Sequence, residues 1–419
     1  MDAEGWGGFL TPLIRVIRMS LGRYPSSYYI LCATAFLMML SISMINPILS
    51  IYAKSIGATG VWIGYAVSGY WITRVLLEIP SGYISSKYGY YRPMLAAMVI
   101  TLVGNVLLVF IKTPVQLVLV RAMKGIGGPL FFAIAMTFMM NLFDAEGRGT
   151  AMGVFQGIEF IGTIIGSGIS GYTIDVLGFK GGFVVAVGLS ALALVLLVVP
   201  KGLRVAAVAE GTRQPLKVGE IFEALTNRNV MIMALATLAE FIMSTGLIMT
   251  VVPLYAQEGL GFSLTEIGFI MGARSIGFVI AMFTMGSISD RIGRKPVLLF
   301  GLVGTAIMTV IMSFMVSFYT IAGIICVIGF TSGAIWIIGP VLSSESVRPE
   351  LRGAAIGAYR TFFDLGSLVG PILMTIVMDG YGVTACFYLA SALLLLNLPT
   401  TMMIRRTSIP EAGSGEVLH

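Results

Sequence analysis

The chain has 419 residues, of which 57% are hydrophobic and 11% are charged, and its mean hydropathy is +0.95. This composition excludes a soluble globular domain, which has no use for so much apolar surface, and predicts an all-α membrane protein whose backbone hydrogen bonds close within each helix. The single histidine is the last residue, and the three cysteines lie in separate apolar runs. We therefore expect no metal site, no cofactor and no disulfide framework.

In chain order, residues 1–26 carry arginines without a long apolar run and predict a short amphipathic segment on the cytoplasmic membrane surface. A six-helix bundle is expected over 27–200, a polar cytoplasmic linker over 201–228, a second six-helix bundle over 229–404 and a cytoplasmic tail over 405–419. Each bundle contains six apolar stretches long enough to cross a bilayer. The expected spans are 27–54, 60–86, 93–111, 115–143, 149–176, 181–200, 229–256, 264–289, 297–316, 319–345, 353–379 and 382–404.

The two bundles are copies of one unit. Residues 82–94 read GYISSKYGYYRPM, and residues 286–298 read GSISDRIGRKPVL, 204 positions later. The same offset carries Gly64 onto Gly268. A duplicated membrane unit is typical of secondary transporters, in which two halves rock about a central site.

The distribution of basic residues predicts the orientation in the membrane. Of the 26 Lys and Arg residues, only Lys54, Lys112 and Lys180 would fall in outside segments, and most of the others fall in inside segments. Because cytoplasmic segments carry the excess of Lys and Arg, both termini are expected in the cytoplasm. The net charge of +6 is then a consequence of topology, and we expect the lipid bilayer rather than a nucleic acid as the partner of this chain.

Nine charged residues lie well inside the expected spans, away from their ends, whereas the third and sixth spans of each half contain none. An ionised group in hydrocarbon costs roughly 3 kcal/mol or more, so these side chains must face water or a partner. We expect those of both bundles to converge on one hydrated chamber midway through the bilayer, which would bind a small solute and protons. The nine residues are Arg74, Glu78, Arg121, Lys124, Glu159, Glu240, Arg274, Arg360 and Asp364.

Two pairs of these residues have helical spacing. Arg74 and Glu78 are four positions apart, as are Arg360 and Asp364, so each pair can meet on one face of its own helix. Two interpretations stay open for such pairs. They hold the bundle together as structural salt bridges, or they take part in binding a polar solute.

Arg121 and Lys124 share one face of the fourth span, where like charges repel unless an acid or an anionic ligand lies between them. Glu159 or Glu240 could supply that acid. These two carboxyl groups are also the better candidates for carrying a proton, because neither has a base three or four positions away.

The two repeated segments, 82–94 and 286–298, resemble the G-x-x-x-D-R-x-G-R-K signature of the major facilitator superfamily. The second-half copy contains Gly286, Asp290, Arg291, Gly293 and Arg294. The first-half copy keeps Gly82, Lys87, Gly89 and Arg92. In the family the acid of this motif takes part in a latch between the halves at the inner face, so Ser86 weakens the first copy and leaves Asp290 as the expected latch residue.

A second segment, Arg121 to Gly127 with Gly125, resembles the R-x-x-x-G-x-G pattern of proton-coupled drug antiporters in the same superfamily. Lys124 stands where that branch often has Gln, and the resemblance implies a role for Arg121 in proton transfer. The fifth span is rich in glycine, as in that branch, but the expected Gly-Pro step occurs in the second half at 370–371 instead.

Aromatic residues within the spans are candidates for the wall of the expected chamber, and filling of the core or contact with lipid is the alternative for each of them. These residues are Tyr70, Trp71, Phe131, Phe132, Phe241 and Trp336.

The resemblance covers about 27–404 and implies twelve helices in two pseudo-symmetric bundles of a monomeric secondary transporter in the inner or plasma membrane. It also implies proton-coupled efflux of an amphipathic small molecule by alternating access. Because bases outnumber acids by one among the nine residues, an organic-anion exchanger or symporter is the alternative. A membrane enzyme or scaffold is a third class, but the chain offers no internal histidine, no Cys/His grouping and no phosphate-binding loop, so we expect no enzyme.

Overall fold

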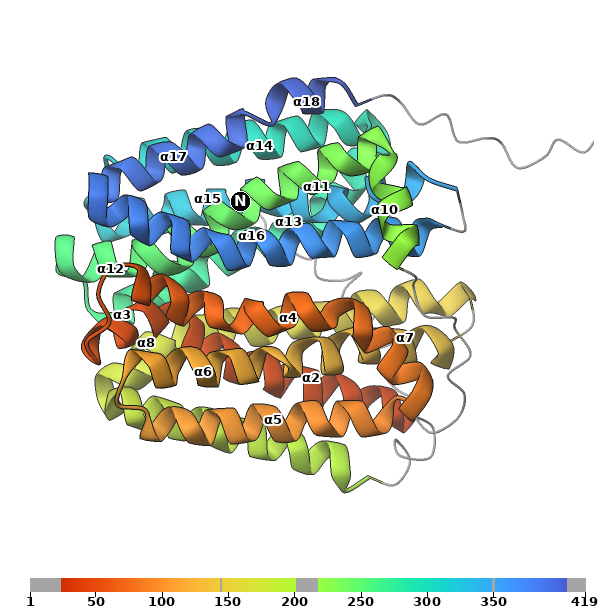
Figure 1. Ribbon diagram of the computed structural model, residues 1–419, viewed down its shortest axis with the longest axis horizontal. Helices are drawn as coiled ribbons and strands as arrows, with labels where there is room; N and C mark the ends of the chain where they lie inside the picture. Colours follow the sequence, from red (N-terminus) through yellow and green to blue (C-terminus); the bar gives the residue numbers. More distant parts are fainter. Residues whose placement is uncertain (1–23, 144, 201–217, 349–350, 405–419) are drawn as a thin grey trace, which may run out of the picture.

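The computed structural model describes residues 24–143, 145–200, 218–348 and 351–404. The expected amphipathic N-terminal segment, most of the linker and the C-terminal tail fall outside these residues. The described helices form two groups, with the N-terminal half below and the C-terminal half above in the view of Figure 1.

The N-terminal half begins with a crossing that changes helix type at Pro47, which has no backbone N–H to donate within an α-helix. Its fourth crossing also changes type at a proline, Pro129. The elements of this half are α2 (Ser26–Ile45), the 3-10 turn η1 (Asn46–Ile48), α3 (Leu49–Ser55), α4 (Val61–Tyr88), α5 (Tyr91–Phe110), α6 (Pro114–Gly125), the π-helix η2 (Pro129–Ala133), α7 (Ile134–Leu142) and α8 (Ala145–Val198).

The C-terminal half begins with a short helix of the linker region, which packs against the first and fifth crossings of this half. Its elements are α10 (Val218–Thr226), α11 (Arg228–Phe241), the π-helix η3 (Ile242–Val251), α12 (Val252–Leu254), the π-helix η4 (Tyr255–Gly259), α13 (Leu264–Ile292), α14 (Arg294–Met312), α15 (Phe318–Glu345), α16 (Arg352–Tyr381), α17 (Val383–Leu395) and α18 (Leu398–Met402).

Ten helices in the described part of the chain are long and apolar enough to cross a membrane. One of them, α8, is broken at Gly178, where a φ of 71° suits glycine, so it supplies the two crossings expected at 149–176 and 181–200. Helix α4 brings the total to twelve, because its 28 residues exceed the roughly 20 that a bilayer requires, although it contains Arg74 and Glu78. The expected all-α fold of two six-helix halves is therefore confirmed.

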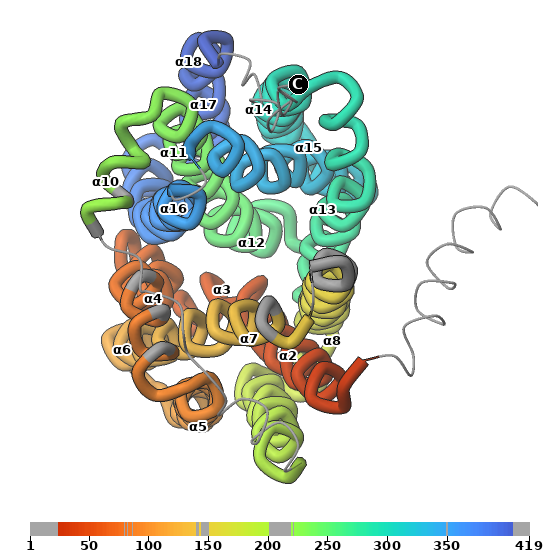
Figure 2. Tube along the Cα trace, turned by 90° about the vertical axis from the view of Figure 1, so that its right-hand side faces the viewer, coloured from red at the N-terminus to blue at the C-terminus, as the bar shows by residue number. Residues whose placement is uncertain are grey.

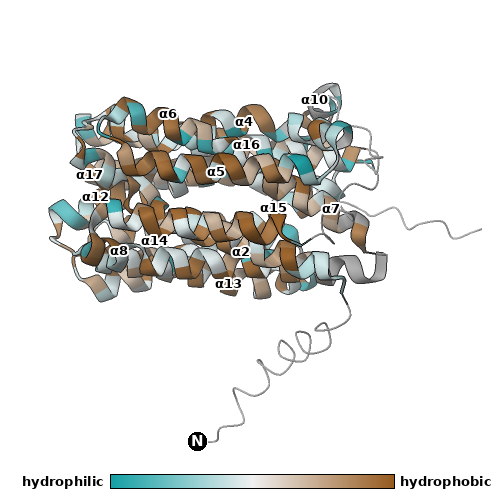
Figure 3. Cartoon of the chain, turned by 90° about the horizontal axis from the view of Figure 1, so that it is seen from below, coloured by the Kyte–Doolittle hydropathy of each residue, from teal (hydrophilic) through white to brown (hydrophobic). Residues whose placement is uncertain are grey.

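Hydrophobic residues cover the central stretch of the helices, and hydrophilic residues gather toward both ends (Figure 3). We call the end that holds Lys54, Asp175 and Glu258 the outer end, and the end that holds Lys87 and Arg294 the inner end. These names follow the orientation that the distribution of Lys and Arg predicts. Helices α5, α14 and α17, which carry no mid-span charge, lie on the sides of each half that face away from the other half (Figures 1 and 2).

The sequence repeat is visible in the packing of each half. In the N-terminal half, Gly125 of α6 lies so close to α4 that an added methyl group would overlap the carbonyl oxygen of Tyr70. In the C-terminal half, Gly329 of α15 lies equally close to α13, against the carbonyl oxygen of Arg274. Each of these four residues is carried onto its counterpart by the 204-residue offset. Close backbone approach at small residues is how membrane helices gain van der Waals contact.

The two halves meet along two helix pairs, α4 with α16 and α8 with α13 (Figure 2). Both pairs contain a close approach at related glycines. An added methyl group on Gly64 of α4 would lie 2.7 Å from the carbonyl oxygen of Pro371, and one on Gly268 of α13 would lie 2.9 Å from the backbone nitrogen of Gly171. Ser68 also donates a 2.6 Å hydrogen bond from α4 to the carbonyl oxygen of Leu368. The boundary between the halves is thus a pair of tight, repeat-related helix crossings.

The crossing at Gly329 provides a stability test. Gly329→Ala is expected to lower the free energy of unfolding by about 1–3 kcal/mol, because the new methyl group meets fixed backbone. Gly323 is the matched control on the same helix, since a methyl group there meets no atom within 4 Å. Gly323→Ala should leave the midpoint of thermal unfolding in detergent unchanged or slightly raised. Equal midpoints of thermal unfolding for the two variants would contradict the close contact between α13 and α15 at Gly329.

Candidate functional site

Two ion pairs join the halves in the middle of the α4–α16 contact. Arg74 of α4 places Nε 2.9 Å from Oδ1 of Asp364 on α16, and Arg360 of α16 places Nε 2.6 Å from Oε1 of Glu78 on α4. The i, i+4 spacing led us to expect Arg74 with Glu78 and Arg360 with Asp364. That pairing is wrong, because the two helices lie against each other and each base takes its closest acid from the opposite half.

Burial makes this exchange of partners significant. The side chain of Asp364 is 0% exposed and that of Glu78 is 8% exposed. A buried charge that loses its partner is strongly destabilising, whereas a paired one is tolerated. Each half therefore supplies an acid and a base whose short ion pairs are made with the other half. Glu159 of α8 also lies within the electrostatic reach of Arg360 and Arg74, so this central cluster has five members.

A continuous series of aromatic rings begins at Arg74 of the central cluster. The guanidinium carbon of Arg74 lies 5.1 Å from the ring centres of both Trp71 and Phe363, a cation–π arrangement. We call the series the aromatic belt, and its successive rings lie 4.0–6.0 Å apart, from α4 through the C-terminal half to α8. The belt consists of Trp71, Phe363, Phe241, Trp336, Phe278 and Phe160.

All rings of the aromatic belt except Phe363 keep part of their surface exposed. Among the other aromatic candidates, Tyr70 lies beside the belt, with its ring centre 5.3 Å from that of Trp71. Phe131 is fully buried in the core of the N-terminal half, and Phe132 packs against the same core. These two phenylalanines therefore fill the core, which was the alternative interpretation of the sequence.

Arg121 and Lys124 have separate surroundings within the N-terminal half. Arg121 donates a 3.3 Å hydrogen bond to Oδ1 of Asn46, and its guanidinium carbon lies 5.2 Å from the ring centre of Tyr70. Lys124 donates to Oδ1 of Asn105 at 2.5 Å. The expected acid between the two bases is absent among the described residues, where neither base forms an ion pair with a carboxylate.

The partner of Lys124 belongs to a polar network inside the N-terminal half. The amide nitrogen of Asn105 donates to the hydroxyl oxygens of Ser41 and Ser190 at 3.0 and 3.1 Å and to the carbonyl oxygen of Ala186 at 3.2 Å. These three acceptors on α2 and α8 orient the amide so that its oxygen faces Lys124. The structure therefore places Lys124 in the bundle interior, apart from the central cluster.

Glu240 and Arg274 form a second polar group in the C-terminal half. Arg274 donates to the hydroxyl oxygen of Ser244 at 2.5 Å, and Glu240 is 3% exposed and within the electrostatic reach of Arg274. One carboxylate oxygen of Glu240 and one of Glu159 have no hydrogen-bond partner among the described residues. The group lies beside the aromatic belt, because Phe241 follows Glu240 directly and contacts Phe363.

The helix changes to π type shortly after Arg121 and Lys124 in the N-terminal half and directly after Glu240 and Phe241 in the C-terminal half. The π-helix η3 begins one residue after Phe241, and the π-helix η2 follows Gly128 on the fourth crossing. π segments leave backbone groups outside the regular i, i+4 ladder and are frequent at functional sites. No π segment is predicted from the sequence. Pro129 was a signal for η2, whereas η3 has no comparable residue at its start.

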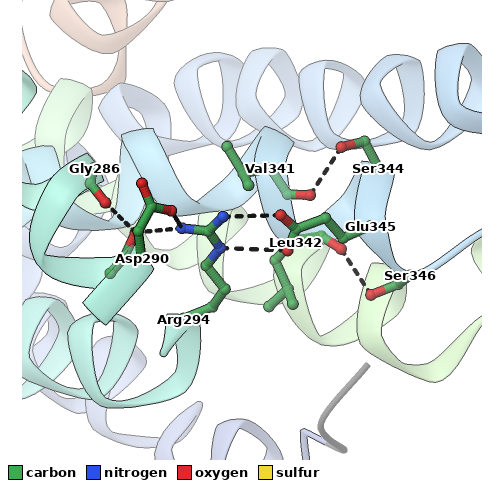
Figure 4. A network of polar contacts seen from close by, with 9 residues as sticks. Gly286, Asp290, Arg294, Val341, Leu342, Ser344, Glu345 and Ser346 are labelled. Atoms are coloured by element: carbon green, nitrogen blue, oxygen red, sulfur yellow. Dashed lines mark hydrogen bonds and ion pairs between the residues drawn. The ribbon is translucent and has the colours of Figure 1, made fainter. Parts of the chain in front are cut away.

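The second copy of the signature motif forms a network within the C-terminal half (Figure 4). Arg294 at the start of α14 pairs with Asp290 of α13 and, through Nη2, with Glu345 of α15 at 2.9 Å. Arg294 also donates to the hydroxyl of Ser289 at 2.6 Å. Gly293, with φ 94°, makes the turn between α13 and α14. The expected contact of Asp290 with the other half stays a prediction, because here its partner is in its own half.

The remaining motif residues lie at the inner end of both halves. Lys87 places its ammonium 5.3 Å from the ring centre of Tyr88, and Gly89, with φ 74°, makes the first-half turn. Arg92 is exposed at the start of α5, and Arg291 is exposed near the end of α13. Gly82 and Gly286 lie within the last turns of α4 and α13.

Comparison with known proteins identifies the class of this molecule. The model of the Major Facilitator Superfamily matches residues 31–263 and 234–416, which together cover most of the chain. The chain is a multi-pass membrane transporter and belongs to the Major Facilitator Superfamily. The fold and the relatives indicate a transporter rather than an enzyme.

The sequence relatives agree with this assignment. An uncharacterised MFS-type transporter of Methanocaldococcus jannaschii is 23% identical over 368 residues, which cover 87% of this chain and 94% of that protein. The multidrug resistance protein MdtG of Proteus mirabilis is 23% identical over 393 residues, covering 92% of this chain and 97% of MdtG. The chain therefore resembles the drug antiporter branch of the family, as its motifs predicted.

Solved structures show the same fold. The nucleoside transporter NupG superposes with a TM-score of 0.74 at 14% identity and covers 90% of this chain and 99% of NupG. A POT family transporter in complex with 5-aminolevulinic acid gives a TM-score of 0.77 at 12% identity, covering 90% of this chain and 95% of that chain.

The cross-half pairing can be tested by a double-mutant cycle. Arg74→Gln is expected to lower the free energy of unfolding by about 3–5 kcal/mol, because it leaves the buried Asp364 without its base. Adding Asp364→Asn should recover at least about 1 kcal/mol, because the uncompensated charge is then gone. The midpoint of thermal unfolding in detergent measures each variant.

A second double-mutant cycle, with Arg74→Gln and Glu78→Gln, measures the coupling energy of the pair on the same helix. This coupling energy should be smaller than that between Arg74 and Asp364. A larger coupling within α4 would contradict the pairing across the halves.

Proposed function

We propose that this transporter exports amphipathic small molecules that carry an aromatic group, driven by protons and working by alternating access as a monomer of the cell's inner membrane. The observation that carries the proposal is the position of the central cluster and the aromatic belt, which both halves build together at the middle of their boundary. A transporter that alternates between two openings needs its binding groups at such a boundary.

The substrate class follows from the chemistry of the belt. Partly exposed rings from α4, α8 and the C-terminal half offer flat apolar surfaces to an aromatic group. The charged pairs beside them offer donors and acceptors of both signs to a polar group. A solute with both features satisfies both surfaces at once. The name of the relative MdtG, a multidrug resistance protein, agrees with this class and supports efflux.

The proton carriers are assigned to Glu159 and Glu240. Glu240 is buried and Glu159 is half-buried, and each has one buried carboxylate oxygen without a hydrogen-bond partner among the described residues. Neither forms an ion pair there. A carboxylate without a bound base can take up a proton and lose its charge without breaking an ion pair. Asp364 and Glu78 would each have to give up an arginine.

Exchange of organic anions is the second candidate function. It is favoured by Arg121, a buried base that meets an amide and a tyrosine ring instead of a carboxylate in the described part of the chain. Together with Arg274 it would supply positive charge to an anionic solute. This candidate predicts uptake of an organic anion that depends on these arginines.

Purified protein in liposomes tests the two candidates. With ethidium as the aromatic cation, an imposed pH gradient is expected to raise flux, and Glu240→Gln or Glu159→Gln should reduce the gradient-driven part at least about tenfold, as loss of an essential proton carrier requires. Glu266→Gln is the matched control, because Glu266 lies at the exposed start of α13.

If ethidium flux does not change with the pH gradient or with either substitution, transport is not coupled to protons. A parallel experiment uses fluorescein as the organic anion. If fluorescein flux exceeds ethidium flux and is lost in Arg121→Gln or Arg274→Gln, anion exchange is the correct function and efflux of amphipathic molecules is not.

A further inference from the structure

The outer end of the molecule contains three contacts between the halves, apart from the central cluster. Lys54 and Glu258 form an ion pair at 2.6 Å, and these two residues are themselves 204 positions apart. The other two contacts are made by Asp175 and Asp379, which are also 204 positions apart. Both aspartates lie near the outer end of a long helix, α8 or α16, and both face the start of a helix in the opposite half.

Asp175 caps helix α13 from the other half. Its Oδ2 accepts hydrogen bonds from the backbone nitrogen of Thr265 at 2.8 Å and from the Thr265 hydroxyl at 2.5 Å. The first backbone N–H groups of a helix have no partner within the helix, and they carry its partial positive charge. Within its own half, Ser263 caps only the N–H of Glu266. The first turn of α13 is therefore completed by a carboxylate from the N-terminal half.

Asp379 occupies the related position at the start of α4. A methyl group added to Gly60, the residue before α4, would overlap Oδ2 of Asp379, so the carboxylate lies directly against the helix start. Gly60 has φ 53°, a value that glycine adopts without strain. The absence of a side chain at this position is what allows Asp379 to approach. The repeat thus produces two carboxylates that each contact the start of a helix in the opposite half.

The two aspartates are exposed like the ion pair, but they act on helix starts and together contribute more than it does to keeping this end closed. The side chains of Lys54 and Glu258 are 45% and 48% exposed, and an exposed pair of this kind shifts an equilibrium by no more than about fivefold. Loss of Asp175, which accepts from the N–H of Thr265, shifts it by about 2- to 30-fold, and loss of the charge of Asp379 by about 2- to 5-fold. Two such contacts that break together multiply their effects.

We propose that Asp175 and Asp379 form a two-part outer latch, in which each carboxylate binds the start of a helix of the opposite half and is released when the outer end opens. The proposal rests on alternating access as the mode of transport. It assigns to the outer end the kind of contact that the signature motif is expected to make at the inner end, with different residues.

Paired nitroxide labels measure the opening directly in the full-length protein in nanodiscs. Labels at Lys112→Cys and Tyr319→Cys, two exposed outer positions in opposite halves, are introduced after replacement of Cys32, Cys326 and Cys386 by Ser. Asp175→Ala with Asp379→Ala is expected to increase the population of longer label distances at least about fivefold. The single variants should give smaller increases, and Asp175→Asn an intermediate one, because asparagine keeps an acceptor oxygen.

Glu266→Ala is the matched control, because it removes a carboxylate from the same helix start without removing a contact between the halves. Its distance distribution should equal that of the unsubstituted protein. An unchanged distribution in the double alanine variant, or equal opening in Glu266→Ala, would overturn the latch.

Gly60→Ala provides an independent variant if the double substitution impairs folding. It keeps both carboxylates but obstructs the approach of Asp379, so it should lengthen the distances more than Gly57→Ala, which strains the same loop at φ 91° without meeting any atom within 4 Å. Equal distributions for these two variants would count against the latch. The label distances are measured without solute. Absence of flux in liposomes would therefore contradict the proposed efflux function. A change in label distance in the latch variants would still show that Asp175 and Asp379 hold the outer end closed.

Discussion

The ion pairs between α4 and α16 impose the constraint on which the arrangement of the two halves depends. A buried charge needs a partner, and at the middle of the boundary the partner of Arg74 and that of Glu78 come from the other half. Each half alone has the charges but not their closest partners. The tight glycine crossing of α4 with α16 at Gly64 holds the backbones of these two helices close together.

The repeat has been used differently at different depths of the membrane. At the outer end the two copies keep equivalent residues, Asp175 and Asp379, in equivalent positions. At the middle the copies have diverged, so that Tyr70 in one half corresponds to Arg274 in the other. Packing within each half needs the same shape twice, whereas a solute site needs chemical groups that differ between its two sides. This difference explains why the symmetry is clearest at Gly125 and Gly329 and weakest around the aromatic belt.

Much of the fold could be predicted from the sequence, because the length of the apolar stretches indicates the membrane-spanning helices and the distribution of Lys and Arg indicates their orientation. The candidate site could be predicted only as a set of charged residues. Helical spacing places Arg74 and Glu78 on one face, but it does not show that α16 lies against that face and takes both as partners. Nor does the sequence show that Arg121 and Lys124 take amide partners, Asn46 and Asn105, from other elements of their own half. The outer carboxylates lie near the ends of long helices, where charged residues are common, and only the offset between them gave a signal.

Charge reversal across and within the helices tests the central pairing most directly. The cross-half reversal, Glu78→Arg with Arg360→Glu, keeps opposite charges together and should restore most of the thermal stability and flux lost in either single variant. The same-helix reversal, Arg74→Glu with Glu78→Arg, should be worse than either of its single variants, because it places an acid beside Asp364 and a base beside Arg360. Recovery by the same-helix reversal and not by the cross-half reversal would contradict the account.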